Sequence, residues 1–284
     1  MAMNADRTVK QLESNLRKWC TAQARPLGER EAQRTLEAVK AANPWRALGP
    51  LDLYAMFLAG QGAVRVLDGD EGGWHLLEDS LIAQTWSLKL AYGRYARRRD
   101  AGEPQGIVNE PNVPARLFAH ALAIESREAA SWLAGAIISS VDNGAFGRWM
   151  LNAFEAYAID LCRLSQGHKP QAPPEAGPYL HILETWNEPD RFGEAIAECC
   201  DYHLTKVKQQ EGFADFITQP YGLFPIEILA TFQLRRASKL EVPRVIHPLL
   251  AIQLAHPPMA SAGVTPRDPI CRSATDLIRQ SLGE

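Results

Sequence analysis

Four side chains with the chemistry of metal ligands lie close together in the C-terminal half of the sequence. His181 and Glu184 are three residues apart on one predicted helix. Asp201 and His203 lie on the next predicted helix. Imidazole nitrogen and carboxylate oxygen suit divalent transition metals, so one alternative is a helical metal-dependent hydrolase. Di-metal helical bundles, however, use a Glu-x-x-His pair, and this spacing occurs at none of the seven histidines. We therefore expect hydrogen-bonded histidines and no metal site.

The five cysteines do not form a recognisable redox or zinc motif. They are an odd number without a CxxC pair, scattered along the chain: Cys20, Cys162, Cys199, Cys200 and Cys271. The two adjacent cysteines would point about 100° apart on a helix. We expect buried thiols and no disulfide framework.

Motifs for other kinds of catalysis are absent from the sequence. It contains no GxxxxGK[ST], GxSxG, HExxH or GxGxxG, and the short Gly60-Gln61-Gly62 run lacks the third glycine. We therefore predict no catalytic or cofactor-binding residues and no cofactor, and we interpret the chain as a binding protein rather than an enzyme.

Two clusters of like charge could contact a partner. Four arginines, Arg94 and 97–99, end a long segment of helical spacing, where cations are stabilised by the helix dipole, and we prefer this structural role to phosphate binding. Asp68, Asp70 and Glu71 lie in a glycine-rich turn. Such turns are usually only solvated, but this one could imitate phosphates toward a nuclease with a positive cleft. We single out these three acidic residues as partner-binding candidates.

The composition is that of an ordinary globular protein. Of 284 residues, 46% are hydrophobic and 22% are charged, and the net charge is −3. This balance excludes general disorder and gives no electrostatic support for direct nucleic-acid binding. The first residues lack a secretory pattern, and no apolar stretch reaches the ~18 residues of a membrane span. We expect a cytoplasmic protein that does not contact membranes; the oligomeric state does not follow from the sequence.

Apolar residues recur at helical spacing along almost the whole chain, beginning with Val9, Leu12, Leu16 and Trp19. Further helices are expected at 29–41, 51–66, 74–99, 115–124, 127–140, 145–164, 179–186, 192–208, 225–236, 247–254 and 269–282. Asp190 is placed as the N-cap of one of them. No alternating strand pattern and no repeat period is found. The prediction is an all-α, irregular multi-helix bundle with no sheet of consequence.

The stretch 100–114 contains three prolines and two glycines and is the first candidate linker. It divides an N-terminal helical part, 1–105, from a C-terminal helical part, 106–284. We expect the two parts to pack as one compact domain.

The most specific sequence motifs lie in the C-terminal third of the chain. It comprises WNEPDRF at 186–192, the segment 195–203, LFPIEILA at 223–230 and HPL at 247–249. This pattern resembles immunity proteins of bacterial polymorphic-toxin and type VI secretion systems, and is most similar to the helical family catalogued as immunity protein forty-nine. The resemblance covers roughly residues 179–250, with a fainter echo at 88–95.

The resemblance implies a cytoplasmic protein that binds and neutralises a cognate secreted toxin, commonly a nuclease, without a cofactor. Motif residues such as Trp186, Asp190 and Glu227 are expected to hold the fold, and none is carried over as a toxin contact. A second hypothesis is a helical adaptor or chaperone that holds an effector during loading. The metal-dependent hydrolase described above is the third.

Overall fold

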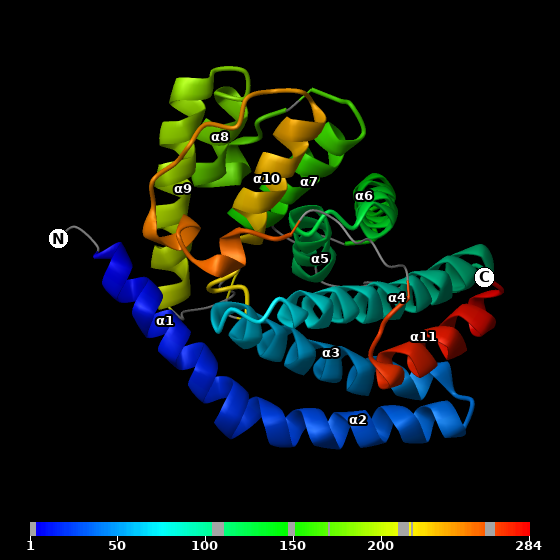
Figure 1. Cartoon of the computed structure of the whole chain (residues 1–284). Helices are drawn as coiled ribbons and strands as arrows, with labels where there is room; N and C mark the ends of the chain where they lie inside the picture. Colours follow the sequence, from blue (N-terminus) through cyan, green and yellow to red (C-terminus); the bar gives the residue numbers. More distant parts are fainter. Residues whose placement is uncertain are drawn as a thin grey trace. The chain divides into compact units, whose positions relative to one another are not determined.

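The helices of the chain group into two compact units. The computed structural model describes residues 4–103, 111–146, 151–169, 171–209, 216, 218–258 and 265–284. Every regular element within these residues is a helix and none is a strand, which confirms the all-α class. One unit combines residues 14–108 with 263–284, and the other combines residues 1–13 with 109–262. We call them the α2–α4 unit and the α5–α10 unit (Figure 1).

The α2–α4 unit is a helical hairpin flanked by two further helices. Its elements are the second half of α1 (Ala5–Trp19), the π-helical turn η1 (Cys20–Ala24), α2 (Arg25–Lys40), α3 (Pro44–Leu67), α4 (Gly72–Asp100) and α11 (Pro269–Leu282). α3 packs along α4, α2 packs along α3, and the C-terminal α11 contacts all three (Figure 1). Leu51, Phe57, Trp86 and Ile278 are among the buried side chains of their shared core.

Two glycines allow α3 and α4 to approach closely. A Cβ atom on Gly62 would lie 2.6 Å from the carbonyl oxygen of Gly73, and a Cβ on Gly73 would collide with the carbonyl oxygen of Gly62. Only hydrogen fits at these positions, because backbone atoms cannot yield as a flexible side chain can. The Gly72-Gly73 pair thus opens α4, and Gly73 also forms its close contact with α3.

Hydrogen bonds attach the C-terminal helix to this hairpin. Asp79 of α4, which is buried, accepts the N–H groups of Arg267 and Asp268 at 2.7 and 2.8 Å. Asp268 caps α11 by accepting from the N–H of Cys271 at 2.9 Å, and it also accepts the hydroxyl of Tyr54 at 2.9 Å. The N-cap explains why α11 begins where the sequence predicted it.

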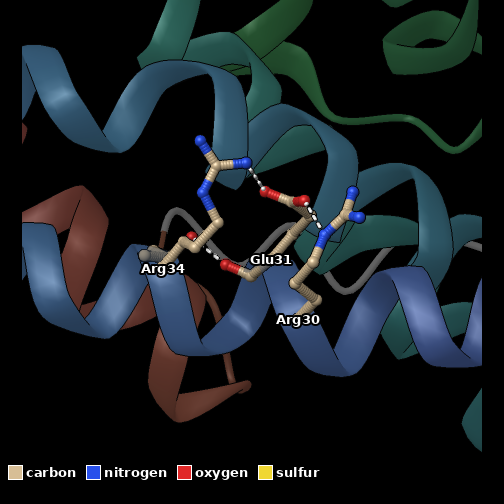
Figure 2. A network of polar contacts seen from close by, with 4 residues as sticks. Arg30, Glu31 and Arg34 are labelled. Carbon is tan, nitrogen blue, oxygen red and sulfur yellow. Dashed lines mark hydrogen bonds and ion pairs between the residues drawn. The ribbon is translucent and has the colours of Figure 1, made fainter.

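A carboxylate is buried under two arginines on α2 (Figure 2). The side chain of Glu31 is 0% exposed, whereas those of Arg30 and Arg34 are 64% and 55% exposed. The two guanidinium groups contact its two oxygens at 2.7 and 2.8 Å. A buried carboxylate is tolerated when charged donors satisfy both oxygens, so the two arginines retain solvent contact and keep Glu31 paired.

The α5–α10 unit is built around α5. Its elements are α5 (Asn112–Ala123), α6 (Arg127–Asp142), α7 (Ala153–Ser165), η2 (Pro174–Tyr179), α8 (Leu180–Glu184), α9 (Pro189–Gln209), α10 (Ile226–Ala237), η3 (Pro248–Leu250) and η4 (Gln253–Ala255). α5 contacts α6, α7 and α10, and α9 contacts α8, η2 and α10. No helix within the described residues has the length and apolarity needed to cross a membrane.

Several predicted boundaries are wrong for identifiable local reasons. α3 begins at Pro44 because Asn43 caps it, accepting from the N–H of Arg46 at 3.2 Å. The helix expected from 145 begins at 153, where Asn152 and Glu155 form a capping box; residues 147–150 lie outside the described residues.

Two further predictions concern the C-terminal half. The helix predicted at 247–254 is wrong, because this stretch forms only the short 3₁₀ turns η3 and η4. Asp190 is not an N-cap, because α9 already begins at Pro189 and Asp190 lies within its first turn. A carboxylate in the first turn still interacts favourably with the helix dipole.

Candidate functional site

The four metal-ligand candidates do not come together. His181 lies near the surface of α8, where Nδ1 is 3.0 Å from a carboxylate oxygen of Glu198. Asp201 is exposed, with one oxygen 3.4 Å from Nε2 of His247, and Glu184 is also exposed. The fourth candidate, His203, is fully buried. Across the described part of the chain, no group of three or more His, Cys, Asp or Glu residues is arranged to hold a metal ion.

His203 forms a buried polar link between α9 and α10. Its Nδ1 is 2.7 Å from a carboxylate oxygen of Glu227, and its Nε2 faces the carbonyl oxygen of Gly222 at 3.2 Å. The ring stacks on Phe216 with centroids 4.4 Å apart. Because both ring nitrogens face oxygens, one proton must lie toward Gly222 and another between the ring and Glu227. Both side chains are 0% exposed, so this link stabilises the fold and cannot meet a substrate.

The residues that carry the family resemblance are also mostly buried. Trp186 and Phe192 pack around the fully buried side chain of Arg235. Its Nε donates to the carbonyl oxygen of Glu241 at 2.8 Å, and one terminal nitrogen donates to the carbonyl of Trp186. Burial lowers the pKa of Arg235. This guanidinium joins the loop before α9 to the chain after α10, which agrees with the expectation that the motif holds the fold.

The predicted acidic turn is largely neutralised by its own neighbours. Asp68, Asp70 and Glu71 are all exposed. Asp68 lies 2.8 Å from a guanidinium nitrogen of Arg17, and Asp70 lies 2.6 Å from Arg65. The hydrogen bond from Arg65 lowers the pKa of Asp70. Two of the three carboxylates thus have cationic partners within the α2–α4 unit, and the role of this turn in binding stays a prediction.

A larger group of exposed carboxylates lies on η2, α8, the turn after α8, and α9. Between residues 175 and 201 the sequence contains seven Asp and Glu residues and a single Arg, and no Lys. All seven are exposed: Glu175, Glu184, Glu188, Asp190, Glu194, Glu198 and Asp201. The arginine, Arg191, is paired with Glu188 at 2.9 Å. We call these seven residues the acidic face.

Four members of the acidic face form a stripe along α9. Asp190, Glu194 and Glu198 recur every fourth residue, and Asp201 follows three residues later. This spacing places them on one side of the helix over roughly 16 Å. Like charges four residues apart destabilise a helix by about 0.2–0.5 kcal/mol per pair. The carboxylates of the stripe therefore repel one another along the helix.

The basic end of α4 is engaged locally. Arg98 lies 2.9 Å from Glu103, and Arg99 lies 3.2 Å from Asp100. Arg94 lies over the ring of Trp45. These contacts favour the structural role expected for this run over phosphate binding.

The cysteines are buried and unbonded to one another. All five are free thiols within the core. Burial raises the pKa of Cys20 to about 11 and raises the pKa values of the other four thiols as well. Because the reactive form is the thiolate, these cysteines are unsuited to redox chemistry, as the sequence indicated.

Comparison with protein-family models, with curated proteins and with solved structures finds no match to this chain. The candidate site therefore rests on its own residues. Sequence reasoning did not single out the acidic face, although the signal was present. It lay in the repeat of Asp190, Glu194 and Glu198 and in the scarcity of basic residues between 175 and 201.

Proposed function

We propose that this chain is an immunity-type binding protein that acts in the cytoplasm and neutralises a cognate secreted toxin, a nuclease. The acidic face is the single observation that carries this proposal. The resemblance of the segments at 186–192, 223–230 and 247–249 to toxin-immunity proteins supports it independently.

The acidic face suits a nuclease because a nuclease must hold phosphates. A cleft that binds a nucleic-acid backbone is lined with Lys and Arg. A stripe of carboxylates on a rigid helix presents complementary charge to such a cleft and accelerates association. Neutralisation in this way requires no chemistry from the chain itself, only occupation of the cleft.

The proposal sets an expected affinity. A toxin must be held before it reaches its substrate, so a dissociation constant near 1 nM or below is required, about −12 kcal/mol. An interface of about 1,600 Å² in total is enough for such a complex. The acidic face supplies the charged part of the interface, and apolar anchors supply most of its energy.

Co-expression tests the proposal directly. Each secreted effector encoded next to this chain's gene is induced in a host with and without the chain, and growth is followed. We expect one effector to be lethal alone, tolerated with the chain, and recovered with it as a stoichiometric complex. If the chain rescues growth from none of the neighbouring effectors, the proposal is wrong.

Effector truncation separates this function from that of an adaptor. A toxin-neutralising protein binds the isolated toxic domain, whereas a loading adaptor binds the delivery domain. We expect the toxic domain alone to retain the complex, with an affinity that falls steeply with salt because charged groups dominate the encounter. Binding confined to the delivery domain would replace this proposal with the adaptor.

A further inference from the structure

A second surface, within the α5–α10 unit, has the opposite character to the acidic face. A hollow of about 330 Å³ lies where α5 ends, α6 begins and α10 ends. Leu122, Ala130 and Leu234 are among its apolar lining residues, and Ser126, Arg127 and Arg236 are among its polar ones. The hollow therefore combines apolar walls with hydrogen-bond donors and two cations.

The N-terminus of α6 opens into this hollow. The first N–H of the helix with a backbone acceptor is that of Ala130, which bonds to the carbonyl of Ser126 at 2.9 Å. The N–H groups at 127–129 precede it and have no acceptor within the helix. Helix N-termini of this kind attract anions through these N–H groups and the helix dipole.

Ser126 adds a buried donor to the same place. The residue is only 5% exposed and occupies the N-cap position of α6, yet its hydroxyl makes no capping hydrogen bond. Within the described residues this hydroxyl has no other protein partner, although it lines the hollow. A hydroxyl that caps nothing and lines the hollow is available to donate to an oxygen acceptor there.

The charges around the hollow favour an anion. Arg127 and Arg236 are exposed and form no ion pair with any residue that the structure describes. The carboxylate in the lining, that of Glu125, accepts a hydrogen bond from the side-chain amide of Gln233 at 2.9 Å. Glu128 lies in the first turn of α6, is exposed, and is not among the lining residues. Two unpaired arginines and a helix N-terminus thus surround the hollow. Of the nearby carboxylates, that of Glu125 is hydrogen-bonded and that of Glu128 is exposed.

The backbone at Glu125 supports a functional reading of this corner. Its φ angle is +58°, in the left-handed region where glycine is the usual residue at the end of a helix. A side chain other than glycine costs about 1 kcal/mol or more in this conformation. Glutamate is present despite that cost, and its carboxylate orients Gln233 along the wall of the hollow.

A larger hollow with both apolar and polar walls adjoins the first. It has a volume of about 570 Å³ and shares Glu125, Gln233 and Arg236 with its neighbour. Its apolar walls include Leu229, Phe232, Val242, Pro243, Val245 and Leu250. A molecule whose anionic group sits at the N-terminus of α6 would extend its remaining atoms over this apolar lining. Ligand sites typically combine a mostly apolar wall with a few convergent polar groups in this way.

We propose that the two hollows form one binding site for a carboxylate joined to an apolar body. The carboxylate accepts hydrogen bonds from the Ser126 hydroxyl and the first N–H groups of α6, and it pairs with Arg127 and Arg236. The apolar body lies in the larger hollow. A free acid and the C-terminus of an apolar peptide share this chemistry. The site does not depend on the function proposed above.

Calorimetric titration of the full chain tests this site with probes of matched size. Octanoate provides the carboxylate and the apolar body, octan-1-ol lacks the charge, and octylamine reverses it. N-acetyl-Val-Leu with a free or an amidated C-terminus provides the peptide form. We expect saturable one-to-one binding of octanoate or the peptide acid and at least tenfold weaker binding of octanol, octylamine and the peptide amide. Preference for one of the two acids identifies the source of the natural ligand.

Variants locate the site. Arg127→Gln and Arg236→Gln should each weaken binding of the acid about tenfold, the loss expected for one charge-assisted hydrogen bond. Ser126→Ala should weaken binding without lowering the melting temperature, because its hydroxyl caps nothing. Glu125→Gln should tighten binding by removing a negative charge. Arg46→Gln, at an exposed arginine of α3, is the matched control and should change nothing.

Three results would overturn the inference. The first is failure of both acids to bind. The second is equal binding of octanol and octanoate, which would leave only apolar adsorption. The third is unchanged affinity in the Arg127→Gln and Arg236→Gln variants, which would place the acid elsewhere.

Discussion

The acidic turn between α3 and α4 and the acidic face of α9 contain the same functional groups in different surroundings. In the turn, Asp68 and Asp70 each lie within 3 Å of an arginine nitrogen. On the acidic face, the single arginine pairs with Glu188, and the stripe on α9 has no basic residue among its members. Glu198 and Asp201 of the stripe lie beside His181 and His247, whereas Asp190 and Glu194 form no ion pair with any residue that the structure describes. A partner would therefore meet two arginine-paired carboxylates at the turn, and at α9 two carboxylates without a cationic partner.

The difference shows that clustering in sequence is a poor guide to net surface charge. Arg17 precedes Asp68 by 51 residues and reaches it only because the helices pack. The turn is conspicuous in the sequence because its acidic residues are adjacent. The acidic face is more dilute in sequence, yet a helix brings residues four apart to the same side. Position in the fold decides which carboxylates remain available.

The largest expected effect tests whether the region of the turn serves the fold. Gly73→Ala should lower the free energy of unfolding by about 3 kcal/mol, because its Cβ would collide with the backbone of α3. Gly49→Ala is the control, since nothing lies within 4 Å of a Cβ at that position of α3. Replacing a helical glycine there should raise stability by about 0.5–1 kcal/mol. Urea unfolding of both variants measures the difference, and equal stabilities would contradict the tight contact.

The next effect is on partner binding. The triple variant Asp190→Asn, Glu194→Gln, Glu198→Gln should raise the dissociation constant of the toxin complex about 100-fold, since charge pairs at an interface contribute one to several kcal/mol each. The double variant Asp68→Asn, Asp70→Asn should change it less than about threefold. Titration calorimetry at two salt concentrations measures both. If the double variant weakened binding more than the triple variant, the toxin would contact the turn at 68–71 rather than α9.

The free energy of unfolding should depend on acid pH through one buried histidine, His120. Burial, and secondarily the charge of Arg116, lowers the pKa of His120 from 6.5 to about 3. Between these values the unfolded chain binds a proton that the folded chain does not. The free energy of unfolding should therefore fall as pH drops from 6.5 toward 3, by up to about 1.4 kcal/mol per pH unit from this residue.

Urea unfolding of the wild type and of His120→Gln at several pH values checks this effect. The variant should be less stable at pH 7 but should lose less stability on acidification. Identical slopes would show that His120 does not control the acid response.

The smallest effect concerns the cost of the stripe. Glu194→Gln removes repulsion with Asp190 and with Glu198, each four residues away, and should raise the free energy of unfolding by about 0.5 kcal/mol. Asp70→Asn should shift stability in the opposite direction, because it removes the pairing with Arg65. Thermal melts of the two variants measure whether the melting temperature rises in Glu194→Gln and falls in Asp70→Asn. A loss of stability in Glu194→Gln would mean that this carboxylate has a structural partner.

The sequence predicted the fold class and most helices because helical spacing of apolar residues is a local signal. α11 was predicted at its observed bounds, since Asp268-Pro269 marks a helix start and Gly283 marks its end. The prediction of a helix at 247–254 was wrong. Its apolar residues, such as Leu249 and Leu254, are buried, but they lie in the short 3₁₀ turns η3 and η4. Apolar spacing over eight residues cannot distinguish these cases.

The candidate sites were harder to predict because they depend on distant partners. His181 lies near the surface of α8, whereas His203 points into the core from α9. Its partner Glu227 comes from a different helix, α10. The hollow at Ser126 joins residues more than 100 positions apart, including Arg236. No spacing rule connects these positions, so only the packed structure brings them into view.

The position of α11 has a consequence for how the chain is made. The core of the α2–α4 unit includes Cys271, Ala274 and Ile278, which are synthesised long after α3 and α4. About 150 residues separate the two stretches of this unit, and at 5–20 residues per second they take roughly 8–30 s to synthesise. During that interval α3 and α4 lack one wall of their core. A chain ended early by a premature stop would never acquire it, and its apolar surface would be left to chaperones and proteases.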